Sequence, residues 1–145
     1  SSVDKLISKE SLNGLHNFNK LKIFQNRIED VKKDLRETLT SLKKNKKTIV
    51  GYGAPTKSTT LLNFFEIDST YIDYIVDDNP LKQEKFSPLL HIPIKSSKTL
   101  FSNDHPDYII ILAWNFADSI IEKIRKNEDF NGKFIIPLPK VMIKD

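Results

Sequence analysis

The amino-acid sequence predicts an α/β fold, a three-layer sandwich whose mainly parallel sheet of four or five strands follows a long amphipathic helix. Two observations predict it. From residue 48 onward, short apolar runs alternate with segments of helical periodicity, and such alternation produces right-handed crossovers and a parallel sheet covered on both faces. Ahead of this region, residues 21–42 carry apolar side chains at three- and four-residue steps, the spacing of one helix face. The length of 145 residues suits one globular domain.

Two segments precede the α/β part. Residues 1–19 contain Gly14 and three asparagines, and we expect a linker or a short helix there; the opening Ser-Ser suggests a tag remnant on an excised piece. Residues 20–47 form the predicted leading helix, with charges opposite its apolar stripe. We expect this helix to dock on residues 48–145, so that 20–145 make one domain. A coiled coil of only three heptads is the second interpretation.

Each element of residues 48–145 has its own signal. The β-branched run 48–52 contains glycine near its end and predicts a buried strand. The run 108–113 is almost wholly apolar, so we expect a central strand there. The other expected elements are helices over 59–65 and 115–126, strands over 71–76, 92–94 and 133–136, and a loop over 81–90. Together they describe a small Rossmann-like sandwich.

Composition excludes several classes of function. The sequence has no cysteine, which excludes disulfides, thiolate metal sites and a cysteine nucleophile. Its three histidines match no metal-binding helix motif. The apolar run 108–114 is far shorter than the roughly 20 residues of a membrane helix, and no signal peptide opens the chain. We therefore expect a cytoplasmic protein without a membrane partner.

The net charge of +4 is concentrated in the leading helix. Between Lys20 and Lys47 there are ten basic and four acidic residues. Lysines at the end of a helix favour the negative end of its dipole, so this cluster needs no nucleic acid to explain it. We expect no nucleic-acid partner.

The first candidate site is the junction at residues 51–58, because ligands of parallel α/β sheets bind at the carboxyl ends of the strands. Gly51 and Gly53 permit a tight turn and a close backbone approach. The helix start that follows, with Lys57, suits a phosphate. Thr56 replaces the third glycine of G-x-G-x-x-G, so a plain tight turn stays an alternative.

The second and third junctions follow residues 76 and 113. An acid such as Asp77 after the second strand is placed to bind ribose hydroxyls, although Asp-Asn-Pro is also ordinary turn chemistry. Trp114 could stack on a base or sugar, or fill the core between sheet and helix. Asn115 could instead cap the next helix. No nucleophile–base pair, carboxylate pair or zinc cluster is recognisable.

Five motifs in chain order resemble the C-terminal domain of S-adenosylmethionine-dependent C-methyltransferases acting on nucleotide-linked deoxysugars. The motifs are GYGAPTKSTTLLNFF, YIVDDNPLKQEKFSP, HIPI, PDYIIILAWNFADSII and GKFIIPLP, and the resemblance covers about residues 21–139. It matches three groups of residues to the family: Gly53, Ala54, Pro55 and Lys57 to its GYGAPxK turn, Asp77, Asn79, Pro80, Lys82 and Gln83 to D-x-N-P-x-K-Q, and Trp114 with Asn115 to LAWNF.

The resemblance also implies a division of labour. In the parent enzyme a zinc-binding region and a central domain, which binds S-adenosylmethionine and carries the proposed base, precede this domain. This chain would hold no metal, no cofactor and no catalytic residue, and would position the nucleotide-linked deoxysugar in a cleft shared with the central domain. The implied binding residues are Gly51, Gly53, Ala54, Pro55, Lys57, Asp77, Asn79, Lys82, Trp114 and Asn115.

Two other interpretations stay open. One is a stand-alone nucleotide-binding or protein-interaction module without catalysis. The other is a fragment of a nicotinamide-dependent oxidoreductase, which the interrupted G-x-G-x-x-G and the missing catalytic pair disfavour.

Overall fold

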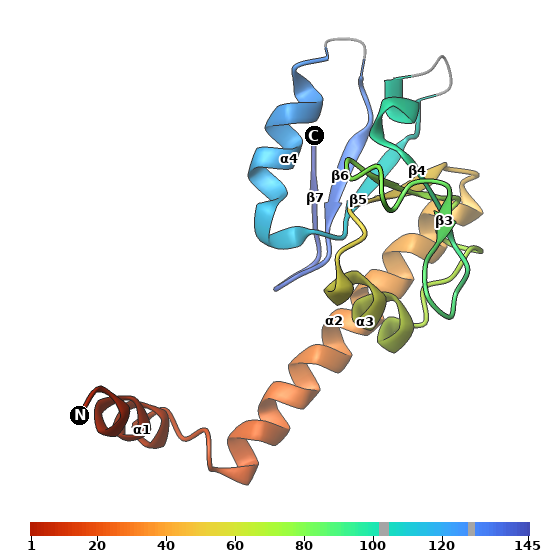
Figure 1. The fold of residues 1–145 in the computed structure, drawn as a ribbon. Helices are drawn as coiled ribbons and strands as arrows, with labels where there is room; N and C mark the ends of the chain where they lie inside the picture. The colour runs from red at the N-terminus through yellow and green to blue at the C-terminus, as the bar shows by residue number, and fades with distance from the viewer. Residues whose placement is uncertain (102–104, 128–129) are drawn as a thin grey trace.

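The computed structural model describes residues 1–101, 105–127 and 130–145. A sheet of seven strands in the order β3-β4-β2-β1-β5-β6-β7 forms the central layer, with α2 and α3 packed against one face and α4 against the other (Figure 1). The five inner strands are parallel, and a short antiparallel strand lies at each edge. The predicted α/β fold, the mainly parallel sheet and the long leading helix are confirmed.

The five parallel strands carry the apolar runs of the sequence. They are β1 (Ile49–Tyr52), β2 (Ile75–Asp77), β4 (Pro93–Ser96), β5 (Tyr108–Ile111) and β6 (Lys133–Ile136). β1 lies between β2 and β5, and β5 lies between β1 and β6, so the predicted interior position of β5 is correct. Ile109, Ile110 and Ile111 are fully buried, as expected for a strand covered on both faces.

The edge strands β3 (Lys85–Phe86) and β7 (Met142–Lys144) were not predicted from the sequence. All their residues are exposed, so the sequence shows no buried periodicity there. The segment 81–90, expected to be a loop, contains β3.

The strand expected over 71–76 is shorter in the structure, because Asp73 bonds to the start of β1. The N–H of Asp73 donates to the Ile49 carbonyl at 2.9 Å. The carboxylate of Asp73 accepts a hydrogen bond from the Ile49 N–H.

The helices are α1 (Ser2–Leu12), α2 (Phe18–Lys44), α3 (Thr56–Phe65) and α4 (Ala117–Arg125). α2 packs on the sheet through Leu35 and Leu39, both fully buried. α1 occupies the segment where a linker or short helix was expected, and Ser1 begins it with a capping box to Asp4. No residue of α1 is buried. α1 and the first half of α2 project from the sandwich (Figure 1).

The strand order changes direction at β1. β2 and β4 extend the sheet on one side, and β5 and β6 extend it on the other. The carboxyl ends of β1 and β5 therefore flank the switch point, where α/β sheets bind ligands. The short 3-10 helices η1 (Ser97–Phe101) and η2 (Trp114–Phe116) follow β4 and β5, so η2 lies at this switch point.

Candidate functional site

The turn after β1 is held by the neighbouring strands. Gly53 has φ +90°, a conformation that favours glycine, and its N–H donates to the Val76 carbonyl at 2.7 Å. A Cβ on Gly53 would lie 3.0 Å from Cβ of Ala113, and one on Gly51 would lie 2.8 Å from Cδ1 of Leu112. Both glycines thus allow the carboxyl ends of β1, β2 and β5 to approach one another closely.

The Asp77 side chain connects two of the predicted junctions. It is 8% exposed; Oδ2 accepts the N–H of Ala54 at 2.7 Å and the ammonium of Lys82 at 3.2 Å, and Oδ1 accepts the N–H of Asn79 at 2.8 Å. The Gln83 amide donates to the Asp77 carbonyl at 2.9 Å. The polar residues of the D-x-N-P-x-K-Q stretch therefore bond to Asp77, which connects the turns after β1 and β2.

Lys57 lies over the aromatic side chains that follow β5. Its Nζ is 4.6 Å from the ring centroid of Trp114 and 5.8 Å from that of Phe116, both within the range of cation–π attraction. Within the described part of the chain, Lys57 forms no ion pair with a carboxylate. Pro55 precedes α3 and no side chain caps this helix. A positive charge and a helix start thus lie together, an arrangement suited to an anion.

Trp114 and Asn115 differ in their surroundings. Trp114 is half-buried and packs against both hydrophobic clusters of the core, so it fills part of the core between sheet and helices. Its stacking on a base or sugar stays a prediction. Asn115 is exposed within η2. It does not cap α4, because α4 begins two residues later and Phe116 precedes it without a side-chain cap. The capping alternative for Asn115 is therefore wrong.

An apolar groove of about 680 Å³ opens beside Lys57. α2 and α3 form two of its walls, and the segments after β5 and β6 form the rest. Its lining residues are Phe24, Arg27, Ile28, Val31, Lys57, Thr60, Leu61, Phe64, Phe65, Trp114, Leu138 and Pro139. Sequence reasoning identified Lys57 and Trp114 but missed the contribution of α2, although Phe24 belongs to the apolar stripe of the leading helix.

A second polar cluster lies at the same edge, on the side of α4. Asp78 accepts hydrogen bonds from the Tyr52 hydroxyl at 2.8 Å, the Lys123 ammonium at 2.7 Å and the Ser97 hydroxyl at 2.6 Å. Partial burial opposes ionisation of Asp78, yet the hydrogen bonds from Lys123, Ser97 and Tyr52 lower its pKa overall. Burial, with the bond to Asp78, raises the pKa of Tyr52.

This cluster attaches α4 to the ends of β1 and β2. Sequence reasoning did not select Asp78, Tyr52, Ser97 or Lys123, because the residues are far apart along the chain and no motif joins them.

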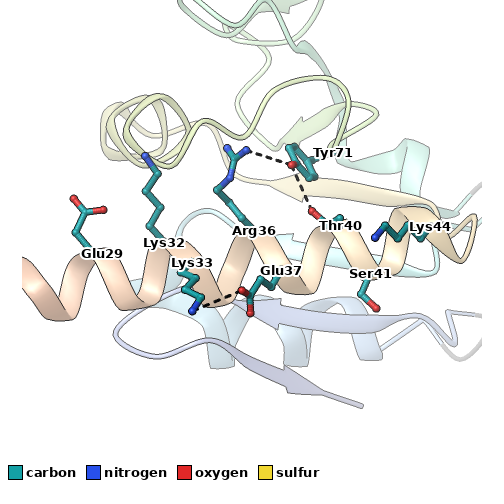
Figure 2. Close-up of a pocket in the computed structure, with 9 residues that line it drawn as sticks. All are labelled: Glu29, Lys32, Lys33, Arg36, Glu37, Thr40, Ser41, Lys44 and Tyr71. Carbon is teal, nitrogen blue, oxygen red and sulfur yellow. Dashed lines mark hydrogen bonds and ion pairs between the residues drawn. The ribbon is translucent and has the colours of Figure 1, made fainter.

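A charged groove of about 640 Å³ runs along α2 (Figure 2). Two of its basic residues, Lys32 and Arg36, bond to the end of α3. Arg36 donates to the carbonyls of Phe65 and Glu66 at 3.0 and 2.6 Å, and Lys32 donates to the Glu66 carboxylate at 2.7 Å. Arg36 thereby satisfies carbonyls at the end of α3 that the helix leaves unpaired. Lys32 and Arg36 thus attach α2 to the end of α3.

Among the described residues, no group of three or more histidine, aspartate or glutamate side chains could hold a metal ion. No helix in the same part of the chain is long and apolar enough to cross a membrane.

The chain is similar to known proteins along most of its length. Residues 1–139 match the sequence model of a family described as the C-methyltransferase C-terminal domain. The chain is also 33% identical, over 139 residues, to the C-methyltransferase NovU of Streptomyces niveus. The match covers 96% of this chain and 33% of that relative, so the chain spans about a third of the length of the relative.

Proposed function

This chain belongs to the family of C-methyltransferase C-terminal domains, and we propose that it positions the substrate of an S-adenosylmethionine-dependent C-methyltransferase. The substrate would be a nucleotide-linked keto-deoxysugar, bound at the carboxyl edge of the sheet. The observation that carries this proposal is the position of Lys57. This residue lies in the first turn of α3, and its ammonium lies over the ring of Trp114 beside the switch point. A diphosphate would bind to this ammonium and to the helix start.

The residues around Lys57 define the shape of the proposed site. A Cβ on Gly53 would lie 3.0 Å from Cβ of Ala113, so glycine lets the turn after β1 pass close to the end of β5 at the proposed site. Asp77 holds Ala54 and Lys82 in place, so the turn is preorganised before a ligand arrives, which lowers the entropic cost of binding. Trp114 and the apolar groove would receive a ring of the substrate.

We infer that S-adenosylmethionine binds outside this domain. A methyl-donor site in an α/β fold needs an acid free to bind ribose hydroxyls. Here the Asp77 carboxylate is bonded to Ala54, Asn79 and Lys82, and the Asp78 carboxylate is bonded to three other side chains. Methyl transfer would therefore take place on residues outside this chain, in the part of a longer enzyme that this domain does not match. A cytoplasmic location is part of the same proposal.

Titration of the labelled domain with thymidine diphosphate tests the site. We expect the amides of Gly53 and Lys57 to shift first. Lys57→Ala should weaken binding about tenfold, the effect of losing one charge-assisted contact of about 1.5 kcal/mol. Lys95→Ala is the matched control, since Lys95 lies over the Tyr74 ring at 4.3 Å on another part of the sheet. Shifts confined to residues 20–47, or equal effects of both variants, would contradict the proposal.

Calorimetry distinguishes binding of the nucleotide from binding of the methyl donor. Titration of the same domain with S-adenosylmethionine should give no binding heat above dilution. Micromolar binding of the methyl donor would show that this division of roles is wrong, even if the nucleotide also binds.

A further inference from the structure

A second pocket, which we call the polar pocket, lies on the opposite side of α3 from the apolar groove. Its volume is about 470 Å³, and it lies over Ile75 and Ile94, which belong to the same core cluster as α3. The connection from β2 to β4 contains the short strand β3 and no helix, although a crossover between parallel strands is usually helical. Right-handed crossovers would place such a helix beside α3. The polar pocket therefore lies where the missing helix would pack.

The walls of the polar pocket carry hydrogen-bonding groups without partners. Thr56 and Thr59 line it from the first turns of α3, and Lys85 lines it from β3. Within the described part of the chain, the hydroxyls of Thr56 and Thr59 form no hydrogen bond and Lys85 forms no ion pair. Phe86 also lines the pocket and is 61% exposed. The pocket thus offers free hydroxyls, a free ammonium and an aromatic ring.

The apolar groove on the other side of α3 has a different chemistry. Most of its lining side chains are apolar, among them Phe24, Phe64 and Trp114. Thr60 lines both cavities, so the first turns of α3 separate them. Lys57, the candidate diphosphate ligand, lies on the side of the groove. A nucleotide-linked sugar has one ring system on each side of its diphosphate, so a diphosphate at the start of α3 would direct one ring to each cavity.

We propose that the polar pocket binds the nucleoside of the substrate and that the apolar groove binds its deoxysugar. This inference rests on the proposed function. A pyrimidine base presents carbonyl oxygens and an imide N–H, which pair with ammonium and hydroxyl groups, and its ring stacks on an exposed aromatic side chain. A deoxysugar lacks hydroxyls that an ordinary sugar has, so an apolar groove leaves fewer of its polar groups without partners. The chemistry of the two cavities therefore gives the substrate one orientation.

This orientation places the ligand across the switch point of the sheet. The polar pocket lies beside β2 and β4, whereas Trp114 follows β5, on the other side of β1. Dinucleotides lie across the same point in doubly wound sheets. The sugar, which is the ring that receives the methyl group, would then lie at Trp114, and the nucleoside would lie at the far side of α3.

Titrations with and without the sugar test the orientation. Thymidine diphosphate should shift the amides of Lys85 and Phe86 in the labelled chain and leave those of Phe64 and Leu138, which line only the apolar groove, unchanged. Thymidine diphosphate rhamnose, whose sugar is a 6-deoxyhexose, should shift Phe64 and Leu138 as well. Shifts of Phe64 and Leu138 by thymidine diphosphate alone, with Lys85 and Phe86 unchanged, would overturn the proposal.

Two variants should have opposite effects in calorimetric titrations. Phe86→Ala should weaken the binding of both ligands about tenfold, because base stacking is lost. Phe64→Ala should weaken only the binding of thymidine diphosphate rhamnose. Leu89→Ala is the control, since Leu89 is 77% exposed in the same segment as Phe86 but does not line the pocket.

The outcomes also separate this inference from the proposed function. Full affinity of Phe86→Ala for thymidine diphosphate, together with weakened binding by Lys57→Ala, would overturn the orientation and leave the proposed function intact. If thymidine diphosphate does not bind to the unmodified chain, the proposed function and this inference are both wrong.

Discussion

The two halves of α2 carry one apolar stripe but have different surroundings. In the second half, Leu35 and Leu39 are fully buried, and Arg36 bonds to the end of α3. In the first half, Leu21 and Phe24 are exposed, and within the described part of the chain no hydrogen bond connects residues 18–28 to the sheet. Apolar periodicity therefore shows which side of a helix is to be covered, and leaves open what covers it.

The largest expected effect compares two leucines of this stripe. Leu39→Ala should lower the free energy of unfolding by about 2–5 kcal/mol, since it leaves a cavity among fully buried side chains. Leu21→Ala should change it by less than about 0.5 kcal/mol, because the side chain is half exposed in the isolated domain. Urea unfolding of both variants measures the difference. Equal losses would mean that the first half of α2 is packed against this domain in solution.

We expect a smaller difference in the free energy of unfolding between variants of two arginines of α2. Arg36→Gln removes donors from the carbonyls of Phe65 and Glu66, and we expect a loss of about 1–2 kcal/mol. Arg27→Gln, in the free half of α2, should have almost no effect on the isolated domain. Urea midpoints of the two variants are the measurement. A loss for Arg27→Gln as large as for Arg36→Gln would show that both halves are attached to the body.

The smallest expected effect depends on pH. The hydrogen bond from Lys32, with help from its charge and that of Arg36, lowers the pKa of Glu66 from its usual value of 4.5. A lowered pKa means that this carboxylate stabilises the fold above pH 4.5, and that the contribution is lost as the pH falls through the folded-state pKa. The urea midpoint of the unmodified chain should exceed that of Glu66→Gln near pH 6. The two midpoints should converge toward pH 3, and a constant gap would contradict the assignment.

Much of the fold was predictable because its inner strands are strongly apolar. β1, β5 and β6 coincide with runs that alternate with helical segments, and the parallel sheet follows from that alternation. The exposed edge strands β3 and β7 were not predictable, since two or three exposed residues carry no periodic signal. The late start of β2, at Ile75 where a strand from residue 71 was expected, was not predictable because it depends on the bond between Asp73 and Ile49, two residues far apart in the chain.

The candidate site was also only partly predictable from the sequence. The positions of Gly53, Lys57 and Trp114 at one edge follow from the rule that parallel strands end together. In the structure Lys57 lies over Trp114 and Gly53 lies against Ala113, the residue before Trp114. The bonding of Asp77 to Ala54 could not be predicted, because it depends on the exact approach of two turns. Asp78 was likewise unremarkable in the sequence until the fold placed Lys123 beside it.

The position of Trp114 has a spectroscopic consequence. It is the only tryptophan in the sequence, its indole packs against both clusters of the core, and the ammonium of Lys57 lies over its ring. Its fluorescence therefore comes from a single place in the molecule, which is sensitive both to the opening of the core and to any anion that draws Lys57 away. The domain carries its own optical probe, so unfolding and ligand arrival can be timed on the same unlabelled chain.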